Sequence, residues 1–111
     1  MKKEVVATQL APAAIGPYSQ AVKVGPFVYL SGQIGLDPAT GELVAGGFEA
    51  QVRQAFANMS QVVAAAGGTL ADVVKLTLFL TDLSNFAQVN QIMVEQMPEP
   101  YPAHSTVGVA S

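Results

Sequence analysis

FEAQVRQAFANMSQVVAAAGGTLADVVKLTLFLT, residues 48–81, combines the pattern of a helix with that of a strand. Its first half spaces apolar residues three and four positions apart, which predicts a helix with one buried stripe. Gly67 and Gly68 then provide the left-handed conformation that ends such a helix. Residues 73–81 alternate and are rich in β-branched and apolar side chains, which predicts a strand. The positions on its apolar face are Val74, Leu76, Leu78 and Leu80.

The residues before this stretch predict a rigid loop followed by a β-hairpin. Residues 11–20 hold two prolines and a glycine among small side chains, which is typical of an extended loop with fixed φ angles. Residues 21–24 and 27–34 have strand patterns on either side of Gly25-Pro26, and this dipeptide predicts the tight turn between them.

The residues after this stretch predict a second helix and a final strand. Ser84 or Asn85 can cap the helix, whose apolar residues again recur at three and four positions. The proline-rich segment 98–102 ends the helix, and residues 103–110 then alternate like a strand.

The predicted order is therefore β-β-α-β-α-β within a single domain spanning residues 1–111. We expect an α+β fold in which one mixed β-sheet carries both helices on one face, because such crossovers are right-handed. The other face would remain uncovered. Half of the 111 residues are apolar and only 12% are charged, so a chain of this size would keep apolar surface exposed. We therefore expect a homo-oligomer.

The composition argues against several classes of function. The chain has no cysteine and one histidine, so neither disulfides nor the usual zinc and copper sites are expected. The 8 carboxylates follow no calcium-loop or zinc-protease motif, and we expect neither a metal nor another cofactor. A net charge of −3 argues against nucleic acid as a partner.

No segment is typical of a signal peptide or a membrane span. The two long uncharged stretches, residues 5–22 and 54–71, are interrupted by prolines or by polar residues and paired glycines. We therefore expect a cytoplasmic protein without membrane contact.

Four places could carry chemistry because of their residue types alone. One is Tyr18, at the end of the rigid loop. Another is Ser31-Gly32-Gln33 in the second hairpin strand, where Gly32 indicates either the close approach of a backbone or ligand, or a β-bulge. Asn90 lies near the buried stripe of the second helix, and its amide is either a local hydrogen bonder or a site residue. His104 is likewise either a hydrogen-bonded structural residue or a catalytic one.

His104 and Ser105 are neighbours but do not form a nucleophile–base pair. Adjacent residues of a strand point to opposite faces, so the two side chains cannot share the hydrogen bond that acyl transfer requires. Thr106, in contrast, shares the face of His104.

Five motifs in order along the chain are similar to those of one known family. They are APAAIGPYSQ at 11–20, SGQI at 31–34, DPATGE at 37–42, DLSNFAQVN at 82–90 and YPAHSTV at 101–107. Together they cover essentially the whole chain, and they resemble the RidA family, also called YjgF/YER057c/UK114. The resemblance implies a chorismate-mutase-like α+β fold and a homotrimer with a central barrel and three sites in the clefts between subunits.

The resemblance also implies an activity. It is the hydrolysis of reactive 2-imino and 2-enamino acids, released by pyridoxal-phosphate enzymes such as threonine dehydratase, to 2-keto acids and ammonia. Such a 2-iminobutanoate/2-iminopropanoate deaminase is a hydrolase acting on C=N bonds. By resemblance, its catalytic residues would be Tyr18, Asn90 and His104. Its substrate-binding residues would be Ser31, the backbone of Gly32, His104 and Thr106.

The sequence departs from the family in two places. Active members have an arginine at the position of His104, where it grips the substrate carboxylate with two bonds. An ordinary imidazole is mostly neutral at pH 7 and makes only one such bond. Arg53, in the first helix, resembles a structural arginine and is not expected to substitute. Family members also continue past Ser111 into a further strand with a glutamate, so we expect the given chain to be incomplete.

Two hypotheses therefore stay open at the level of the sequence. The first is an imine deaminase whose substrate anchoring is weakened by His104. The alternative is a non-catalytic trimer that binds small 2-imino or 2-keto carboxylates or has a regulatory role. An activity of the endoribonuclease L-PSP kind, attributed to some relatives, fits poorly with the acidic charge and the single histidine.

Overall fold

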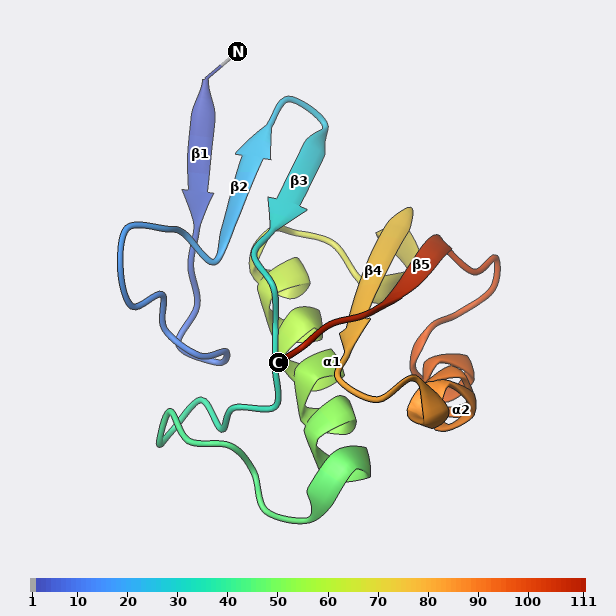
Figure 1. The fold of residues 1–111 in the computed structure, drawn as a ribbon. Coiled ribbons are helices and arrows are strands. Elements are labelled where there is room, and N and C mark those ends of the chain that lie inside the picture. The colour runs from blue at the N-terminus through green and yellow to red at the C-terminus, as the bar shows by residue number, and fades with distance from the viewer. Residues whose placement is uncertain (1) are drawn as a thin grey trace. The chain divides into compact units, whose positions relative to one another are not determined.

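The computed structural model describes residues 2–111, which divide into two compact units, Met1–Thr69 and Leu70–Ser111. Each unit combines β-strands with one α-helix, and Figure 1 colours them from blue to red along the chain. The expected α+β class is confirmed. Among the described residues, no helix is long and apolar enough to cross a bilayer.

The first unit contains a three-stranded antiparallel sheet in which the middle strand pairs with both others. The strands are β1 (Lys3–Val6), β2 (Ala21–Val24) and β3 (Phe27–Leu30). The expected turn between β2 and β3 is present, and Gly25 adopts a positive φ of 57° there, which a residue with a side chain rarely does. The predicted hairpin is therefore confirmed.

Strand β1 was not predicted from the sequence. It is 4 residues long, begins with Lys3 and Glu4, and buries only Val6. Its conformation depends on pairing with β2, where Val5 lies opposite Val22. A pairing between segments so distant along the chain leaves no local pattern in a short, charged segment.

Helix α1 (Gly47–Ala65) contributes Val62 to the core of the first unit. It follows Gly46, and it ends as predicted before Gly67, whose φ of 93° is left-handed. The core cluster contains small and β-branched residues from β1, the following loop, β2 and α1, namely Val6, Ala11, Ala21 and Val62. The helix therefore holds both the sheet and the loop that contains Ala11.

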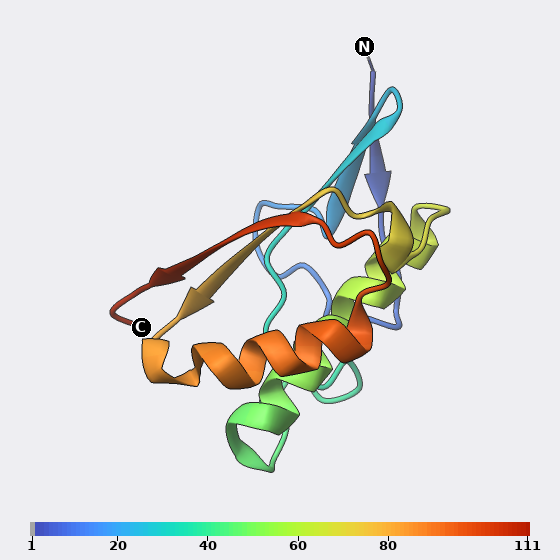
Figure 2. The same cartoon turned by 90° about the vertical axis from the view of Figure 1, so that its right-hand side faces the viewer.

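The second unit contains two parallel strands connected through a helix. Strand β4 (Lys75–Leu80) pairs with β5 (Ala103–Gly108), and helix α2 (Phe86–Gln96) lies between them in sequence. Figure 2 shows α2 below the two strands. Short 3₁₀ turns, Leu70–Asp72 and Leu83–Asn85, precede β4 and α2.

Two details differ from the sequence prediction. The strands form a three-stranded antiparallel and a two-stranded parallel sheet, where one mixed sheet was expected. Alternation identifies a strand but does not specify its hydrogen-bonding partner. In addition, β3 ends at Leu30 and does not continue to Ile34. The pairing continues for only one more residue, where the amide of Ser31 donates to Gln20 O at 3.0 Å. Beyond it the carbonyl of Ile34 accepts a hydrogen bond from Asn58 Nδ2 and so is bound to helix α1 instead of a strand.

Candidate active site

A pocket of about 410 Å³ lies in the first unit beside the loop of residues 11–20. Tyr18 lines it from the loop, and Gly32 and Ile34 line it from the segment that follows β3. Tyr18 is 54% exposed, so much of its ring is accessible from this side. The structure therefore brings together the predicted catalytic Tyr18 and the predicted substrate-binding Gly32.

The loop of residues 11–20 is held by the side chain of Gln20, which is only 4% exposed. Its Oε1 accepts a hydrogen bond from Thr8 N at 2.6 Å. Its Nε2 donates to the carbonyl oxygens of Thr8, Ala11 and Pro12 at 3.0, 3.3 and 2.7 Å. The prolines restrict φ, and the buried amide fixes the path of the backbone. The loop is therefore held by specific bonds in addition to its rigid composition.

Ser31 joins the end of β3 to the same loop. Its hydroxyl donates to Ser19 O at 2.6 Å, and its N–H donates to Gln20 O at 3.0 Å. A serine hydroxyl has one hydrogen and two lone pairs, so while this bond persists Ser31 offers only acceptor capacity to a ligand. Ser31 thus has a structural contact in addition to its predicted binding role.

Gly32 lies outside the strands, so the alternative of a β-bulge is wrong. A Cβ atom at this position would meet no heavy atom within 4 Å among the described residues. On the side where a Cβ would lie, no backbone among the described residues therefore approaches Gly32 closely. Because Gly32 lines the pocket, its backbone borders open space there.

Strand β5 carries two of the predicted site residues on one face. The parallel register places His104 opposite Leu76 and Thr106 opposite Leu78, which confirms that the two polar residues share a face. The Oγ1 atom of Thr106 is buried and has no hydrogen-bond partner within residues 2–111. Buried hydroxyls nearly always have a partner, so a bound water or ligand is expected to supply the one that Thr106 lacks.

Ser105 points to the opposite face of β5. Its hydroxyl accepts a hydrogen bond from Lys75 Nζ at 2.9 Å, so the side chain bonds across the ladder to β4. The exclusion of a His104–Ser105 pair agrees with this contact. Asn90 is half-buried on α2 between the buried residues Val89 and Ile92. Its role as a site residue stays a prediction.

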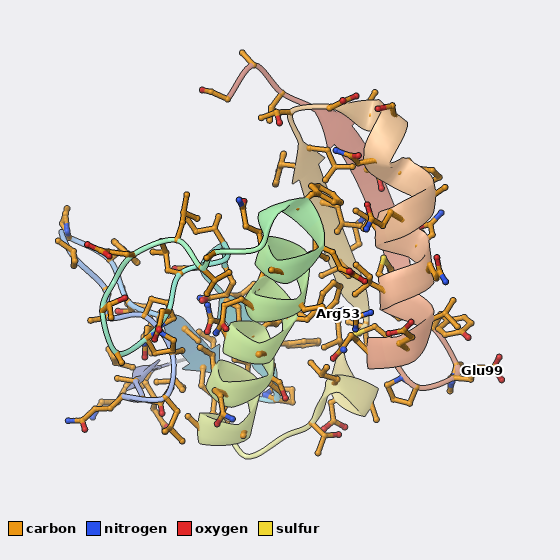
Figure 3. All side chains as sticks on the ribbon, turned by 90° about the horizontal axis from the view of Figure 1, so that it is seen from below. Arg53 and Glu99 are labelled. Atoms are coloured by element: carbon orange, nitrogen blue, oxygen red, sulfur yellow. The ribbon has the colours of Figure 1, made fainter. Side chains whose placement is uncertain are left out.

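Arg53, labelled in Figure 3, lies on α1. Its guanidinium donates to Glu49 Oε1 at 3.3 Å, one turn earlier in the helix. Pairs of opposite charge at this spacing stabilise helices modestly. Glu99, also labelled in Figure 3, lies in the loop between α2 and β5. The sequence contains no second arginine, so β5 has no guanidinium of its own at the position of His104.

The electrostatics of the two units are simple. Within residues 2–111, no group of three or more histidines, carboxylates or cysteines could hold a metal ion. The hydroxyl and the backbone N–H of Ser84 bond to the Asp82 carboxylate and hold its pKa below the usual range. This contact caps the 3₁₀ turn before α2 and lies outside the candidate site.

Two buried polar residues were not predicted as part of any site. Gln20 and Asn58 are the buried polar side chains of the described residues, and both contact the backbone of segments that line the pocket. The sequence did contain a signal that Asn58 is buried. Asn58 lies three residues after Ala55 and four before Val62, on the apolar stripe of the first helix. Gln20 is the last residue of the motif quoted for residues 11–20, but no local sequence pattern indicates that its side chain is buried.

The comparisons with known proteins decide the family. The family model described as Endoribonuclease L-PSP matches residues 8–111. The chain belongs to the RidA family. A RidA-family relative from Dermatophagoides farinae, named "2-iminobutanoate/2-iminopropanoate deaminase", is 50% identical over 97% of this chain and 84% of its own length. The human protein of the same name is 44% identical, with 98% of this chain and 80% of that protein covered.

A solved structure confirms the RidA fold. The crystal structure of RidA from an Antarctic Psychrobacter species has 54% sequence identity to this chain and a TM-score of 0.93. The match covers 97% of this chain and 87% of that one. The resemblance inferred from the five motifs is therefore confirmed for both family and fold.

Proposed function

We propose that this RidA-family chain hydrolyses 2-imino and 2-enamino acids to 2-keto acids and ammonia, as a 2-iminobutanoate/2-iminopropanoate deaminase. The observation that carries the proposal is its 50% identity, over 97% of its length, to a relative of that name. The pocket beside Tyr18 supports it, because a volume of about 410 Å³ accommodates a small carboxylic acid.

The reaction adds water to the C=N bond and then releases ammonia. The water oxygen attacks the carbon of the protonated imine, the π electrons move to nitrogen, and the water loses a proton. The nitrogen takes up a proton, the C–N bond breaks, and the O–H electrons form the C=O bond of the keto acid. The iminium carbon is already electrophilic, so the protein needs no nucleophile and acts by positioning the substrate, placing water and stabilising charge.

The residues of the first unit suit the reacting carbon and nitrogen. Tyr18 offers a phenolic hydroxyl that can donate to and accept from the attacking water. The Ser31 hydroxyl, with its hydrogen directed at Ser19 O, can accept a hydrogen bond from the iminium N–H. The backbone of Gly32 borders the pocket without a side chain to obstruct the substrate.

The residues of the second unit suit a carboxylate. The hydroxyl of Thr106 lacks a partner within residues 2–111 and can donate a hydrogen bond to a carboxylate oxygen. His104 on the same strand face can donate a second bond, which carries charge when the imidazole is protonated. The Asn90 amide would position water or substrate.

The proposed assembly is a homotrimer with sites at the clefts between subunits. Its support is the outward apolar surface of the strands, which a monomer of this size would otherwise leave in water. The large exposed side chains of the two sheets are Val5, Phe27, Tyr29, Phe79 and Val107. Sedimentation equilibrium gives the mass of the assembly, and a monomer at micromolar concentration would contradict this part of the proposal.

A second candidate function is favoured by one observation, the histidine where active family members have an arginine. A non-catalytic trimer would bind small 2-keto carboxylates without turnover of the imines. We propose no nucleic acid partner, because the net charge of −3 opposes binding to a polyanion. Calorimetry with 2-ketobutyrate separates binding from catalysis.

The proposed function is tested by supplying the imine as it forms. A pyridoxal-phosphate dehydratase produces 2-aminoacrylate from serine or 2-iminobutyrate from threonine, and the release of keto acid and ammonia is followed with and without this protein. We expect a faster release with the protein, and a larger increase with His104→Arg. An unchanged rate for both folded proteins at pH 6, together with binding of 2-ketobutyrate, would establish the non-catalytic alternative.

A further inference from the structure

Gln20 and Asn58 stand out because buried polar side chains are rare and each of these two is fully engaged. Gln20 is 4% exposed and Asn58 is 0% exposed. Removing such groups from water is unfavourable unless every donor and acceptor finds a partner. Neither amide contacts the ladder of the three-stranded sheet. Both bond instead to irregular backbone that borders the pocket beside Tyr18.

Asn58 holds one wall of this pocket against helix α1. Its Nδ2 donates to Ile34 O at 3.0 Å and to Leu36 O at 2.9 Å, and both of these residues line the pocket. Its Oδ1 accepts a hydrogen bond from Gln54 Nε2 at 2.8 Å, which orients the amide from one turn earlier. The three bonds leave the Asn58 side chain one preferred orientation.

Gly35 shows how closely this wall lies on the helix. A Cβ atom at Gly35 would be 2.7 Å from Gln51 Cα and 2.8 Å from Gln51 O, which are backbone atoms that cannot move aside. Gly35 lies between the two carbonyls that Asn58 binds. The wall therefore contacts α1 at Gln51 and at Asn58, two turns apart.

Gln20 holds the opposite wall. Its Nε2 bonds to Ala11 O and Pro12 O, and Pro12 lines the pocket together with Gln20 itself. The two walls meet where the Ser31 hydroxyl bonds to Ser19 O. Two amides from different elements thus fix the two backbone segments that present Tyr18 and Gly32.

We infer that Asn58 and Gln20 are positioning residues of the site, which set the separation between the Tyr18 loop and the Gly32–Leu36 wall and so the placement of the substrate. This inference rests on the proposed function for its catalytic consequence. Its structural part, that each amide holds one wall, is independent of the substrate.

The activity test uses substitutions that conserve volume and remove the hydrogen bonds. In Asn58→Leu the carbonyls of Ile34 and Leu36 lose their donors and turn toward water, and in Gln20→Met those of Ala11 and Pro12 do the same. We expect each variant to lower kcat/KM at least tenfold, mainly through kcat, because a misplaced substrate still binds but reacts slowly. Asn58→Ser, which keeps a donor for one carbonyl, should recover part of the loss and also serves if Asn58→Leu does not fold.

Two controls separate positioning from a general loss of stability. Gln54→Met removes only the bond that orients Asn58 and leaves its two donors to the wall carbonyls, so kcat/KM should fall less than in Asn58→Leu. Val63→Ala removes buried volume on the same helix, at a residue outside the pocket lining, and should lower the unfolding midpoint with kcat/KM retained. If Val63→Ala lowers kcat/KM as much as Asn58→Leu at equal stability, the inference is wrong.

Amide hydrogen exchange distinguishes failure of this inference from failure of the proposed function. We expect Asn58→Leu to speed exchange at least tenfold at Leu36 and Val44, and Gln20→Met to do so at Thr8 and Tyr18, with exchange in α1 unchanged. This result would stand even if no imine were hydrolysed, in which case only the catalytic consequence fails. Unchanged exchange at all four amides would overturn the inference itself.

Discussion

The Ser31 hydroxyl donates to the carbonyl oxygen of Ser19 at 2.6 Å, and this bond joins the end of β3 to the loop that carries Tyr18. The acceptor belongs to the main chain. The connection therefore depends on the side chain of Ser31 and not on that of Ser19. These two serines, twelve positions apart in sequence, can be substituted separately to test what the bond contributes.

Ser31→Ala should destabilise the protein by about 0.5–1.5 kcal/mol, the usual contribution of one hydrogen bond, and should also lower kcat/KM. Ser19→Ala keeps the acceptor and should leave both quantities near the wild type. Urea unfolding and the imine-hydrolysis assay measure the two effects. Equal losses in the two variants would show that the hydroxyl–carbonyl bond is unimportant.

His104→Arg should raise the rate of imine hydrolysis about ten- to a hundredfold. A guanidinium offers a charged pair of bonds to a carboxylate, and a charged hydrogen bond contributes about 1.5–3 kcal/mol. Ser105→Arg introduces the same charge on the opposite face of β5 and serves as the control. A gain of equal size in Ser105→Arg would mean that overall charge, and not anchoring at position 104, raises the rate.

Gly32→Ala and Gly35→Ala should affect different properties, substrate access and stability respectively, although the two glycines are only three residues apart. A methyl group at position 32 meets no atom of the described chain, so the stability should change by less than about 0.5 kcal/mol while substrate access to the pocket suffers. At position 35 the same group collides with the backbone of Gln51, and destabilisation of about 1–3 kcal/mol is expected. Thermal unfolding and KM report the two effects, and a stability loss at Gly32 would contradict the open geometry.

Asp82→Ala should weaken the start of α2 in a pH-dependent way. The Ser84 hydroxyl and N–H hold the pKa of the Asp82 carboxyl below its usual range, so the stabilisation is present above that range and is lost as the pH falls through the lowered value. The urea midpoints of wild type and Asp82→Ala should therefore differ at pH 7 and approach each other as the pH falls below the ordinary carboxyl value of 3.8. A difference that grows on acidification would contradict this sign.

Most of the fold could be predicted because local patterns specify its larger elements. The spacing of Phe56, Met59 and Val63, at three and four positions, predicted α1. Gly67 predicted its end, and alternation predicted β4 and β5. Strand β1 could not be predicted, because its four residues gain their conformation from pairing with β2. The number of sheets was wrong for the same reason, since hydrogen-bond partners are not a local property.

The candidate site could be predicted only in part. Tyr18 and Gly32 border one pocket, and His104 and Thr106 share one strand face, as the motifs and the alternation indicated. The extent of β3 was overestimated, because the carbonyls of Ile34 and Leu36 bond to the buried amide of Asn58 on α1 and not to a neighbouring strand. Asn58 was missed although it interrupts an apolar helix stripe, the same criterion that had pointed to Asn90.

The two amides that hold the pocket walls carry no charge. Neither Gln20 nor Asn58 titrates in the range where proteins are handled, and hydrogen bonds between neutral buried groups are little affected by dissolved ions. The shape of the pocket should therefore change little with ionic strength. In His104→Arg, a dependence of catalysis on added salt would report the attraction between the substrate carboxylate and the new charge.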